Sequence, residues 1–324
     1  MTTRTQPRIA SLLPSATEMV CAVGARAGLV GRSHECDYPA DVTPVPILTG
    51  PRRALPHASG AIDRTIREIL TDAIAVYEVD VAALEQARPD VIVTQDLCDV
   101  CAVSLDDVRT ALRELAQDDV QICSLKPSRL QDVWDDVRRV GEALGRPAEG
   151  EAAASALEAR CAEIARQASN LTRRSVLSIE WLDPVMVGGT WMPELIAMAG
   201  GDPLVTQPGE HAPTLDLEQL AALDPDVVLI KPCGFDLART AEELDLVATK
   251  LPWGTWRAVR NGKVFLADGN AYFNRPGPRL VESLEILAAI THPEVFPGLT
   301  RRHATSMRVV TPDRQLVPPP VSGA

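Results

Sequence analysis

The chain has 324 residues, enough for two domains of ordinary size or one large one; 46% of the residues are hydrophobic and 23% are charged. This balance excludes a disordered chain and a membrane-embedded one. Asp and Glu outnumber Lys and Arg by 44 to 32, and the net charge of −12 disfavours nucleic acid and anionic membranes as partners. We therefore expect a soluble globular protein with small, neutral or cationic partners.

The start of the chain and the cysteines predict the compartment. Arg4 and Arg8 are present, but Pro14 and Glu18 interrupt the apolar run that a secretory signal needs. Seven cysteines, an odd number spread over a chain too large to need disulfides, are typical of reduced thiols. No stretch approaches the roughly 20 apolar residues of a membrane span. The sequence thus predicts a cytoplasmic protein that is not embedded in a membrane.

The first half alternates short strands with helices. In chain order we expect a strand over 8–13, a helix over 15–24, a strand at 30–31, a loop over 32–39, helices over 62–70 and 81–87, and a strand over 91–93. Such alternation predicts an α/β fold with a largely parallel sheet that helices cover on both faces.

The second half repeats this plan. A short helix at 217–220, an Asp-Pro-Asp turn and a strand at 227–230 follow the order and spacing of the first-half segments from 81 to 94. A glycine also stands six residues after a glutamate in both halves, as Glu18 with Gly24 and Glu194 with Gly200. Two copies of one α/β lobe are the simplest explanation.

A long helix is expected between the copies. Helical periodicity over 130–144 ends at Gly145, and residues 147–172 are rich in alanine and other strong helix formers. We therefore predict two Rossmann-like lobes with mostly parallel sheets, at 8–146 and 173–298, joined by one helix over 147–172. Residues 299–324, with several prolines, are expected to be an extended or disordered tail.

In such folds a ligand binds outside the carboxyl ends of the strands, here in the cleft between the lobes. Only 4% of the residues are aromatic, yet the segments after the predicted strands contain Tyr38, Trp181, Phe235, Tyr272 and Phe273. Flat aromatic and amide groups with few charges suit a large, planar, mostly apolar ligand with polar edges. The alternative for Trp181 and Phe273 is that they fill the cores of the lobes.

A second constellation could bind a metal. It consists of His34 and Cys36 in one loop with Cys98 and Cys101 in another. Thiolates and an imidazole could hold zinc or iron, or could approach the metal of a bound macrocycle. One CxxC pair is not diagnostic, and the alternative is that the cysteines are packing residues. His211, in a loop before the repeated helix, either faces the ligand or is simply solvated.

Signatures of common enzymes are missing from the sequence. It contains no GxSxG, no GxxxxGK[ST] and no HExxH motif. Ser15 follows a strand but lacks the flanking glycines of a nucleophile elbow. We therefore expect a binding protein and not an enzyme.

Four segments carry a family resemblance: RIASLLPSATE at 8–18, CDYP at 36–39, RPDVIV at 88–93 and YFNRPGPR at 272–279. Over about residues 8–290 the chain resembles the cobalamin-binding and iron-siderophore-binding proteins of ABC importers. The resemblance implies the class III periplasmic-binding-protein fold, in which one long helix bridges two lobes. It also implies that the ligand is cobalamin or a related corrinoid.

The resemblance also implies site residues. It places a corrinoid against Tyr38, Tyr272, Phe273 and Arg275, with His211 at the rim. Together with the loop residues, the predicted ligand-binding set is His34, Asp37, Tyr38, Gln95, Asp96, Trp181, His211, Tyr272, Phe273, Asn274 and Arg275. Acidic residues of such proteins dock onto an ABC permease, and Glu18 and Glu194 are candidate equivalents. The missing signal peptide and lipoprotein cysteine depart from the importers and suggest a cytoplasmic branch.

These observations support three hypotheses. The first is a corrinoid-binding protein that passes its ligand to a permease or to another cobalamin-handling protein. The second is a metal- or redox-active protein that uses His34, Cys36, Cys98 and Cys101. The third is a haem or iron-siderophore binder on the same scaffold.

Overall fold

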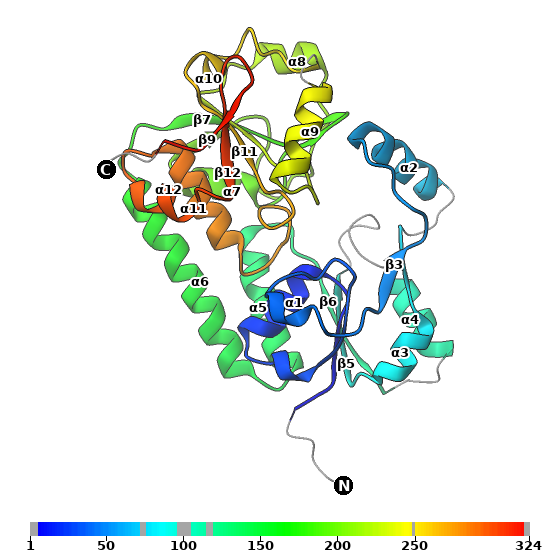
Figure 1. The fold of residues 1–324 in the computed structure, drawn as a ribbon. Helices are drawn as coiled ribbons and strands as arrows, with labels where there is room; N and C mark the ends of the chain where they lie inside the picture. The colour runs from blue at the N-terminus through cyan, green and yellow to red at the C-terminus, as the bar shows by residue number, and fades with distance from the viewer. Residues whose placement is uncertain (1–5, 72–75, 96–104, 115–118, 248–249, 321–324) are drawn as a thin grey trace. The chain divides into compact units, whose positions relative to one another are not determined.

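The structure is a computed structural model, which describes residues 6–71, 76–95, 105–114, 119–247 and 250–320 (Figure 1). The chain packs into two compact units. The first unit consists of residues 1–57, 64–127 and 131–158. The second unit consists of residues 58–63, 128–130 and 159–324.

The first unit is built on a four-stranded sheet with the strand order β2-β1-β5-β6, in which every pairing is parallel. The strands are β1 (Ile9–Ser11), β2 (Leu29–Arg32), β5 (Val91–Gln95) and β6 (Gln121–Leu125). All residues of the central strands β1 and β5 are buried. Continuous burial is expected because both faces of a parallel sheet are covered.

Helices and a small ribbon complete this half of the chain. The helices are α1 (Pro14–Ala22), α2 (Ser59–Thr71), α3 (Val81–Ala87), α4 (Leu105–Glu114) and α5 (Leu130–Ala143), with short 3-10 turns η1 (Arg26–Gly28) and η2 (Ala40–Val42). The antiparallel ribbon pairs β3 (Thr49–Pro51) with β4 (Tyr77–Val79). The core of the first unit brings together Ala10, Leu12 and Ile92 near the strands with Leu84, Val108 and Leu112 of the helices.

The long helix is α6 (Pro147–Ala168), with 22 residues. Its residues up to Glu158 belong to the first unit, and those from Ala159 onward belong to the second. The proline at its first position has the fixed φ that a helix start favours, and the alanine-rich interior follows without a break. The prediction of one long helix joining two α/β lobes is therefore confirmed.

The second unit has a mixed sheet with the order β13-β12-β11-β10-β7-β8, and β9 pairs with the start of β7. The strands are β7 (Arg174–Leu182), β8 (Val185–Val187), β9 (Gly201–Pro203), β10 (Val227–Ile230), β11 (Val264–Ala267), β12 (Met307–Val310) and β13 (Leu316–Val317). Strands β7, β10 and β11 run parallel. Strands β8, β12 and β13 are antiparallel to their neighbours.

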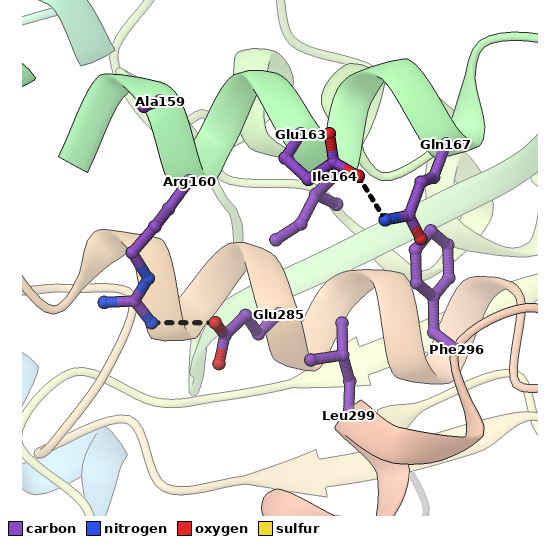
Figure 2. A pocket seen from close by; sticks show the side chains of 8 residues that line it. All are labelled: Ala159, Arg160, Glu163, Ile164, Gln167, Glu285, Phe296 and Leu299. Carbon is purple, nitrogen blue, oxygen red and sulfur yellow. Dashed lines mark hydrogen bonds and ion pairs between the residues drawn. The ribbon is translucent and has the colours of Figure 1, made fainter. Parts of the chain in front are cut away.

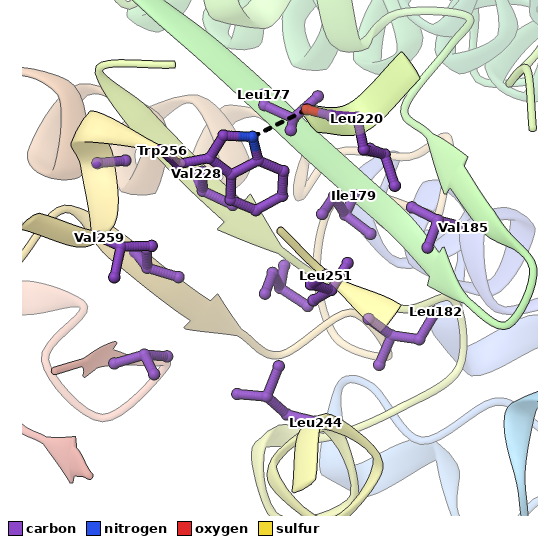
Figure 3. Close-up of a cluster of buried hydrophobic side chains, with 14 of the residues drawn as sticks. Leu177, Ile179, Leu182, Val185, Leu220, Val228, Leu244, Leu251, Trp256 and Val259 are labelled. Carbon is purple, nitrogen blue, oxygen red and sulfur yellow. Dashed lines mark hydrogen bonds between the residues drawn. The ribbon is translucent and has the colours of Figure 1, made fainter. Parts of the chain in front are cut away.

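The helices of the second unit are α7 (Met192–Met198), α8 (Leu217–Ala222), α9 (Leu237–Val247), α10 (Arg257–Arg260), α11 (Leu280–Thr291) and α12 (Pro297–Arg302). Its main apolar cluster surrounds Trp256, which is fully buried (Figure 3). The indole Nε1 of Trp256 donates to the carbonyl of Leu220 at 3.0 Å, so the polar atom of this large side chain keeps a partner inside the core.

The internal repeat is visible in local structure. Helices α1 and α7 both have a proline in the first turn, and both are followed by a glycine with positive φ, at +71° for Gly24 and +79° for Gly200. Glycine adopts this C-terminal conformation without steric cost. Helices α3 and α8 both begin after an aspartate, Asp80 or Asp216, whose carboxylate accepts a backbone N–H of the first turn.

The predicted tail over 299–324 is wrong in its described part. Residues 297–302 form α12, and β12 pairs with β11 as part of the second sheet. Met307, Val309 and Val310 are buried there. The prolines that suggested an extended tail begin only at Pro312, after this apolar strand has joined the sheet.

Candidate ligand-binding site

Three parallel strands of the second unit end in charged residues. Glu180 lies near the end of β7, Lys231 directly follows β10, and Asp268 directly follows β11. Because the carboxyl ends of parallel strands share one edge of the sheet, these groups and the segments after them lie at the same edge of this unit. The segment over 268–275 includes four of the predicted ligand-binding residues.

Lys231 is the most buried cation of this edge, with 0% of its surface exposed. Its ammonium donates to Oε2 of Glu180 at 3.0 Å and to Oδ1 of Asn274 at 2.8 Å. The amide nitrogen of Asn274 donates in turn to the carbonyls of Lys231 and Gly269, at 3.0 and 2.9 Å. Asn274 therefore fastens its own segment to the end of β10, and its amide serves the fold instead of a ligand.

The turn after β11 is shaped by Asp268. Its Oδ1 accepts the backbone N–H groups of Asn270 and Ala271 at 3.0 and 2.8 Å. Burial raises the pKa of Asp268 above its ordinary value. The guanidinium of Arg275, which is only 8% exposed, donates to Oδ1 of Asn270 at 2.9 Å and closes the turn.

Phe273 is buried, with 1% of its surface exposed. Its backbone has a φ of +65°, which is rare for a residue other than glycine. Its N–H donates to Oγ of Ser283 and its carbonyl accepts Nε1 of Trp191, at 2.9 and 2.8 Å. The ligand-contacting role predicted for the Phe273 ring is thus not supported, because the ring packs inside the second unit, as the alternative expected.

Tyr272 is partly buried, and its neighbours hold the ring from two sides. The Arg279 guanidinium lies 4.4 Å from the ring centroid, and the His303 ring meets it edge-on at 6.3 Å. The Tyr272 hydroxyl accepts a hydrogen bond from the Ser306 hydroxyl, with the two oxygens 3.2 Å apart. Tyr272 is therefore an aromatic group with a fixed position on this edge.

Trp181, at the end of β7, is partly buried and packs against Phe235 of the segment after β10, with ring centroids 5.3 Å apart. The guanidinium of Arg239 lies 3.9 Å from the centre of the Phe235 ring. The indole nitrogen of Trp181 donates to the carbonyl of Asp183 at 3.2 Å. Phe235 is buried at 2% exposure, so Trp181 is the ring of this pair that reaches the surface.

In the first unit, the loop after β2 is held by Arg32. Its guanidinium donates to three backbone carbonyls of the loop at 2.8 to 3.1 Å, those of Ser33, Cys36 and Thr43. The next residues, Asp37 and Tyr38, are nevertheless exposed, Tyr38 by 43%. A fixed loop thus presents an exposed aromatic ring.

His34 lies in the same loop and is partly buried. Both its N–H and its Nδ1 meet Oγ1 of Thr49, at 3.2 and 2.9 Å. Its ring lies 5.1 Å from that of Tyr77, whose hydroxyl donates to Glu35 at 3.1 Å. Burial lowers the pKa of His34, which favours the neutral imidazole.

The predicted metal site finds no support in the described residues. Cys36 is buried and its Sγ contacts Oγ1 of Thr17 at 3.0 Å, whereas His34 bonds to Thr49. Cys98 and Cys101 lie outside the described residues. Within the described part of the chain, no group of three or more His, Cys, Asp or Glu side chains could hold a metal ion.

The other predicted site residues are spread over both units. Gln95 is the last residue of β5 and is buried at 5% exposure, so it belongs to the sheet and not to a loop. Asp96 lies outside the described residues. His211 is exposed, in a segment that crosses Gly189 so closely that a Cβ there would meet the carbonyl of Glu210 at 2.4 Å.

The two predicted docking carboxylates differ in accessibility, because Glu194 is partly exposed and Glu18 is not. Glu18 is buried at 3% exposure within α1. Glu194, at the start of α7, accepts the Arg129 guanidinium at 3.1 Å and the Leu130 N–H at 2.8 Å. Docking on a partner needs accessible carboxylates, so Glu18 does not fit this role.

Sequence reasoning missed two residues, Lys231 and Glu180. Both stand in the segments that were selected as following strands, but neither was assigned a role. A lysine directly after a run of four buried strand residues is the signal that could have identified it, because lysine is almost never fully buried without a partner.

A groove elsewhere on the second unit contains none of the predicted ligand residues. It lies between α6 and the pair α11 and α12, and is lined by Ala159, Arg160, Glu163, Ile164, Gln167, Glu285, Phe296 and Leu299 (Figure 2). Its apolar walls are buried core side chains, Ile164 at 7% and Phe296 at 4% exposure. Nothing in it points to the ligand predicted above.

The two α/β units and the long helix match the fold that the family resemblance implies. A family model described as "Periplasmic binding protein" matches residues 9–271. The chain belongs to the periplasmic binding protein family and is a substrate-binding protein of that type. The predicted fold class and family resemblance are thereby confirmed.

Individual relatives are distant. A vitamin B12-binding protein of Vibrio cholerae serotype O1 is 24% identical over 284 residues, which is 86% of each chain. Among solved structures, a periplasmic heme-binding protein from Pseudomonas aeruginosa has a TM-score of 0.66 at 22% identity, over 89% of this chain and 93% of that one. The periplasmic vitamin B12 binding protein BtuF of Vibrio cholerae has a TM-score of 0.59 at 20% identity, over 89% of this chain and 97% of that one.

These comparisons correct the predicted location. The family and the solved relatives are periplasmic, which points to a periplasmic and not a cytoplasmic protein. The cytoplasmic prediction depended on the first residues and on the odd number of cysteines, and the family match overrides both. In the part of the chain that the structure describes, no helix has the length and apolarity to cross a bilayer.

Proposed function

We propose that this protein binds a corrinoid, cobalamin or a precursor, at the loops that follow its parallel strands, and passes it on without a chemical step. The observation that carries the proposal is the exposure of Tyr38, 43%, on a loop that Arg32 fastens by three hydrogen bonds. The loop keeps this large aromatic ring exposed to solvent. A flat ligand that covers the ring removes its apolar surface from water, which favours binding.

The second unit supports the same ligand class. Tyr272 and Trp181 are partly buried rings with fixed neighbours at the carboxyl edge of the sheet. The segment over 268–275 also supplies the Arg275 guanidinium, which can meet a polar edge of the ligand. Rigid aromatic groups with a few placed polar groups are what a large planar ligand requires.

The B12-binding relative of Vibrio cholerae favours a corrinoid. By analogy with its family, we propose that an ABC permease receives the ligand, with another cobalamin-handling protein as the alternative recipient. Glu194 is the candidate docking residue, and release of its carboxylate from Arg129 would be part of docking.

A direct experiment is titration of the purified protein with cyanocobalamin, followed by gel filtration and isothermal calorimetry. We expect a one-to-one complex that keeps the red chromophore, and Tyr38→Ala to weaken it at least about tenfold, as loss of a buried aromatic contact predicts. Leu246→Ala is the matched control, because Leu246 is 67% exposed on α9 and has no proposed ligand role. If cyanocobalamin and hydroxocobalamin both pass through unbound, the proposal fails.

Haem is the second candidate, since a phenol at the position of Tyr38 could coordinate ferric iron, and a heme-binding relative shares the fold. Tyr38→Phe separates the two ligands. A corrinoid that stacks on the ring keeps its affinity in this variant, whereas haem bound through the phenolate loses its charge-transfer absorption band. Iron-siderophore binding is tested in the same titration with a ferric hydroxamate.

A further inference from the structure

The fully buried lysine at the end of β10 has no part in ligand contact. With 0% exposure, its ammonium cannot reach a bound molecule. Desolvating an ammonium costs several kcal/mol, and its partners Glu180 and Asn274 offset that cost at 3.0 and 2.8 Å. Apolar replacements of such pairs are often neutral in stability, so a geometric role is the better explanation for the charge.

The geometric role follows from what the ammonium connects. It joins the end of β7, through Glu180, and the end of β10 to Asn274, which lies 43 residues further along the chain. Asn274 uses both ends of its amide in this arrangement, because its nitrogen donates to the carbonyls of Lys231 and Gly269. The orientation of Asn274 is therefore determined completely.

Close packing prevents the segment from shifting. A Cβ on Gly269 would lie 2.1 Å from the carbonyl oxygen of Pro232, so the backbone after β11 touches the backbone after β10. Phe273, next to Asn274, is held at a φ of +65° by Ser283 and Trp191. An unusual φ persists only when the surrounding contacts determine it.

We propose that Lys231, together with Glu180, is a positioning residue that holds Asn274 and thereby places Tyr272 and Arg275 for the ligand. This inference rests on the proposed function for the ligand and for its contact with Tyr272 and Arg275. The placement itself is a property of the unliganded protein and can be measured without a ligand.

The test compares Lys231→Met with Lys263→Met. Lys263 is a partly buried lysine of the same unit that precedes β11, at the opposite end of the strand. In the unliganded proteins, we expect faster hydrogen exchange at the amides of residues 270–275 for Lys231→Met and no change for Lys263→Met. Unchanged exchange in Lys231→Met overturns the proposal.

Ligand binding gives the second measurement. We expect Lys231→Met to weaken the binding of cyanocobalamin at least about tenfold, because the variant loses hydrogen bonds that involve a charged group. In a Tyr272→Ala/Arg275→Ala background the same change should weaken binding less than about twofold, because Lys231 acts through these two residues. A full tenfold loss in that background contradicts the proposal.

A third variant distinguishes the loss of the positioning role from a general destabilisation of the fold. Lys231→Met leaves the Glu180 carboxylate without its ammonium, and Glu180→Gln in the same chain removes that charge. We expect the double variant to regain thermal stability but not ligand affinity, because Asn274 still lacks its donor. Recovery of both contradicts the proposal. If the wild type itself binds no corrinoid, the proposed function fails while the exchange comparison still decides the role of Lys231.

Discussion

Nε2 of His303 lies 2.8 Å from Oε2 of Glu285, and both residues are buried, His303 at 5% and Glu285 at 4% exposure. Glu285 also accepts Arg160 of α6 at 2.7 Å and Arg302 at 3.1 Å. The His303 ring in turn meets Tyr272 edge-on. One buried carboxylate thus connects the long helix to the aromatic group that we propose faces the ligand.

Glu285→Gln is expected to lower the free energy of unfolding by about 3 kcal/mol at neutral pH, because it breaks a buried ion-pair network. Burial opposes ionisation, but the hydrogen bonds from His303 and Arg160 lower the pKa of Glu285 to about 2, from an ordinary value of 4.5. The unfolded chain takes up this proton first, so the stabilisation is complete above pH 4.5 and is lost as the pH falls toward 2.

Urea unfolding of wild type and Glu285→Gln at pH 7 and pH 3 measures this dependence, and the difference between them should shrink at the lower pH. Glu163→Gln is the control. Arg166 also lowers the pKa of Glu163, but that pair is exposed on α6, and we expect almost no change in stability. An equal loss in both variants would contradict the importance of burial.

Asp136 of α5 should behave in the opposite way. It is 1% exposed, its Oδ1 contacts Arg139, and its Oδ2 has no hydrogen-bond partner among the described residues. Burial raises its pKa from 3.8 to about 7. The folded protein therefore holds a proton that the unfolded chain has released, and stability falls as the pH rises from about 4 to 7.

Asp136→Asn, which keeps the size without the charge, is expected to be more stable than wild type by about 1 kcal/mol at pH 8, with no gain at pH 4. Thermal unfolding at the two pH values measures this. A gain of the same size at both values would show that the charge of Asp136 is not the cause.

Gly269→Ala tests the close approach beside Lys231. The new Cβ would lie 2.1 Å from the Pro232 carbonyl oxygen, which backbone atoms cannot avoid by a side-chain rotation. We expect a loss of about 1–3 kcal/mol in the free energy of unfolding. Gly254→Ala is the matched control, because no atom lies within 4 Å of its new Cβ, and chemical denaturation should not distinguish it from wild type.

The two halves of the repeat can be compared through their helix caps. Asp80→Ala and Asp216→Ala each remove a carboxylate that accepts a first-turn N–H, at 2.9 and 2.8 Å. Each change should lower stability by about 1 kcal/mol. Asp245→Ala, at an exposed position of α9, serves as a non-capping control, and denaturant midpoints that rank all three variants equally would argue against the capping role.

Local patterns predicted much of the fold correctly. The helix expected over 81–87 is α3 with the same bounds, and the strand expected over 227–230 is β10. Both depend on neighbouring residues alone, an N-terminal aspartate for the helix and a continuous apolar run for the strand. The prediction for the tail was wrong because strand β12 is recognisable mainly through its antiparallel pairing with β11, in which Val264 pairs with Val310 and Ala267 with Met307.

The candidate site was predicted less completely. Most of the segments predicted to follow strands do so in the structure, although Gln95 still belongs to β5, and Tyr38 is exposed in the segment after β2. Phe273 and Asn274 were assigned to the ligand, but one is packed in the core and the other is bonded to Lys231 and Gly269. A sequence shows which residue types follow a strand, whereas their direction depends on backbone angles such as the φ of Phe273.

The sequence by itself determined the fold class, the repeat, the long helix and the family, because each follows from periodicity, spacing or motifs along the chain. Only the tertiary structure decided which side chains reach the surface. Lys231 meets Glu180 across 51 residues and Asn274 across 43, and no local pattern contains such pairings. The free-energy cost of burying a charge depends on the hydrogen-bond partners that folding brings to it. The register of the parallel strands determines which partners those are.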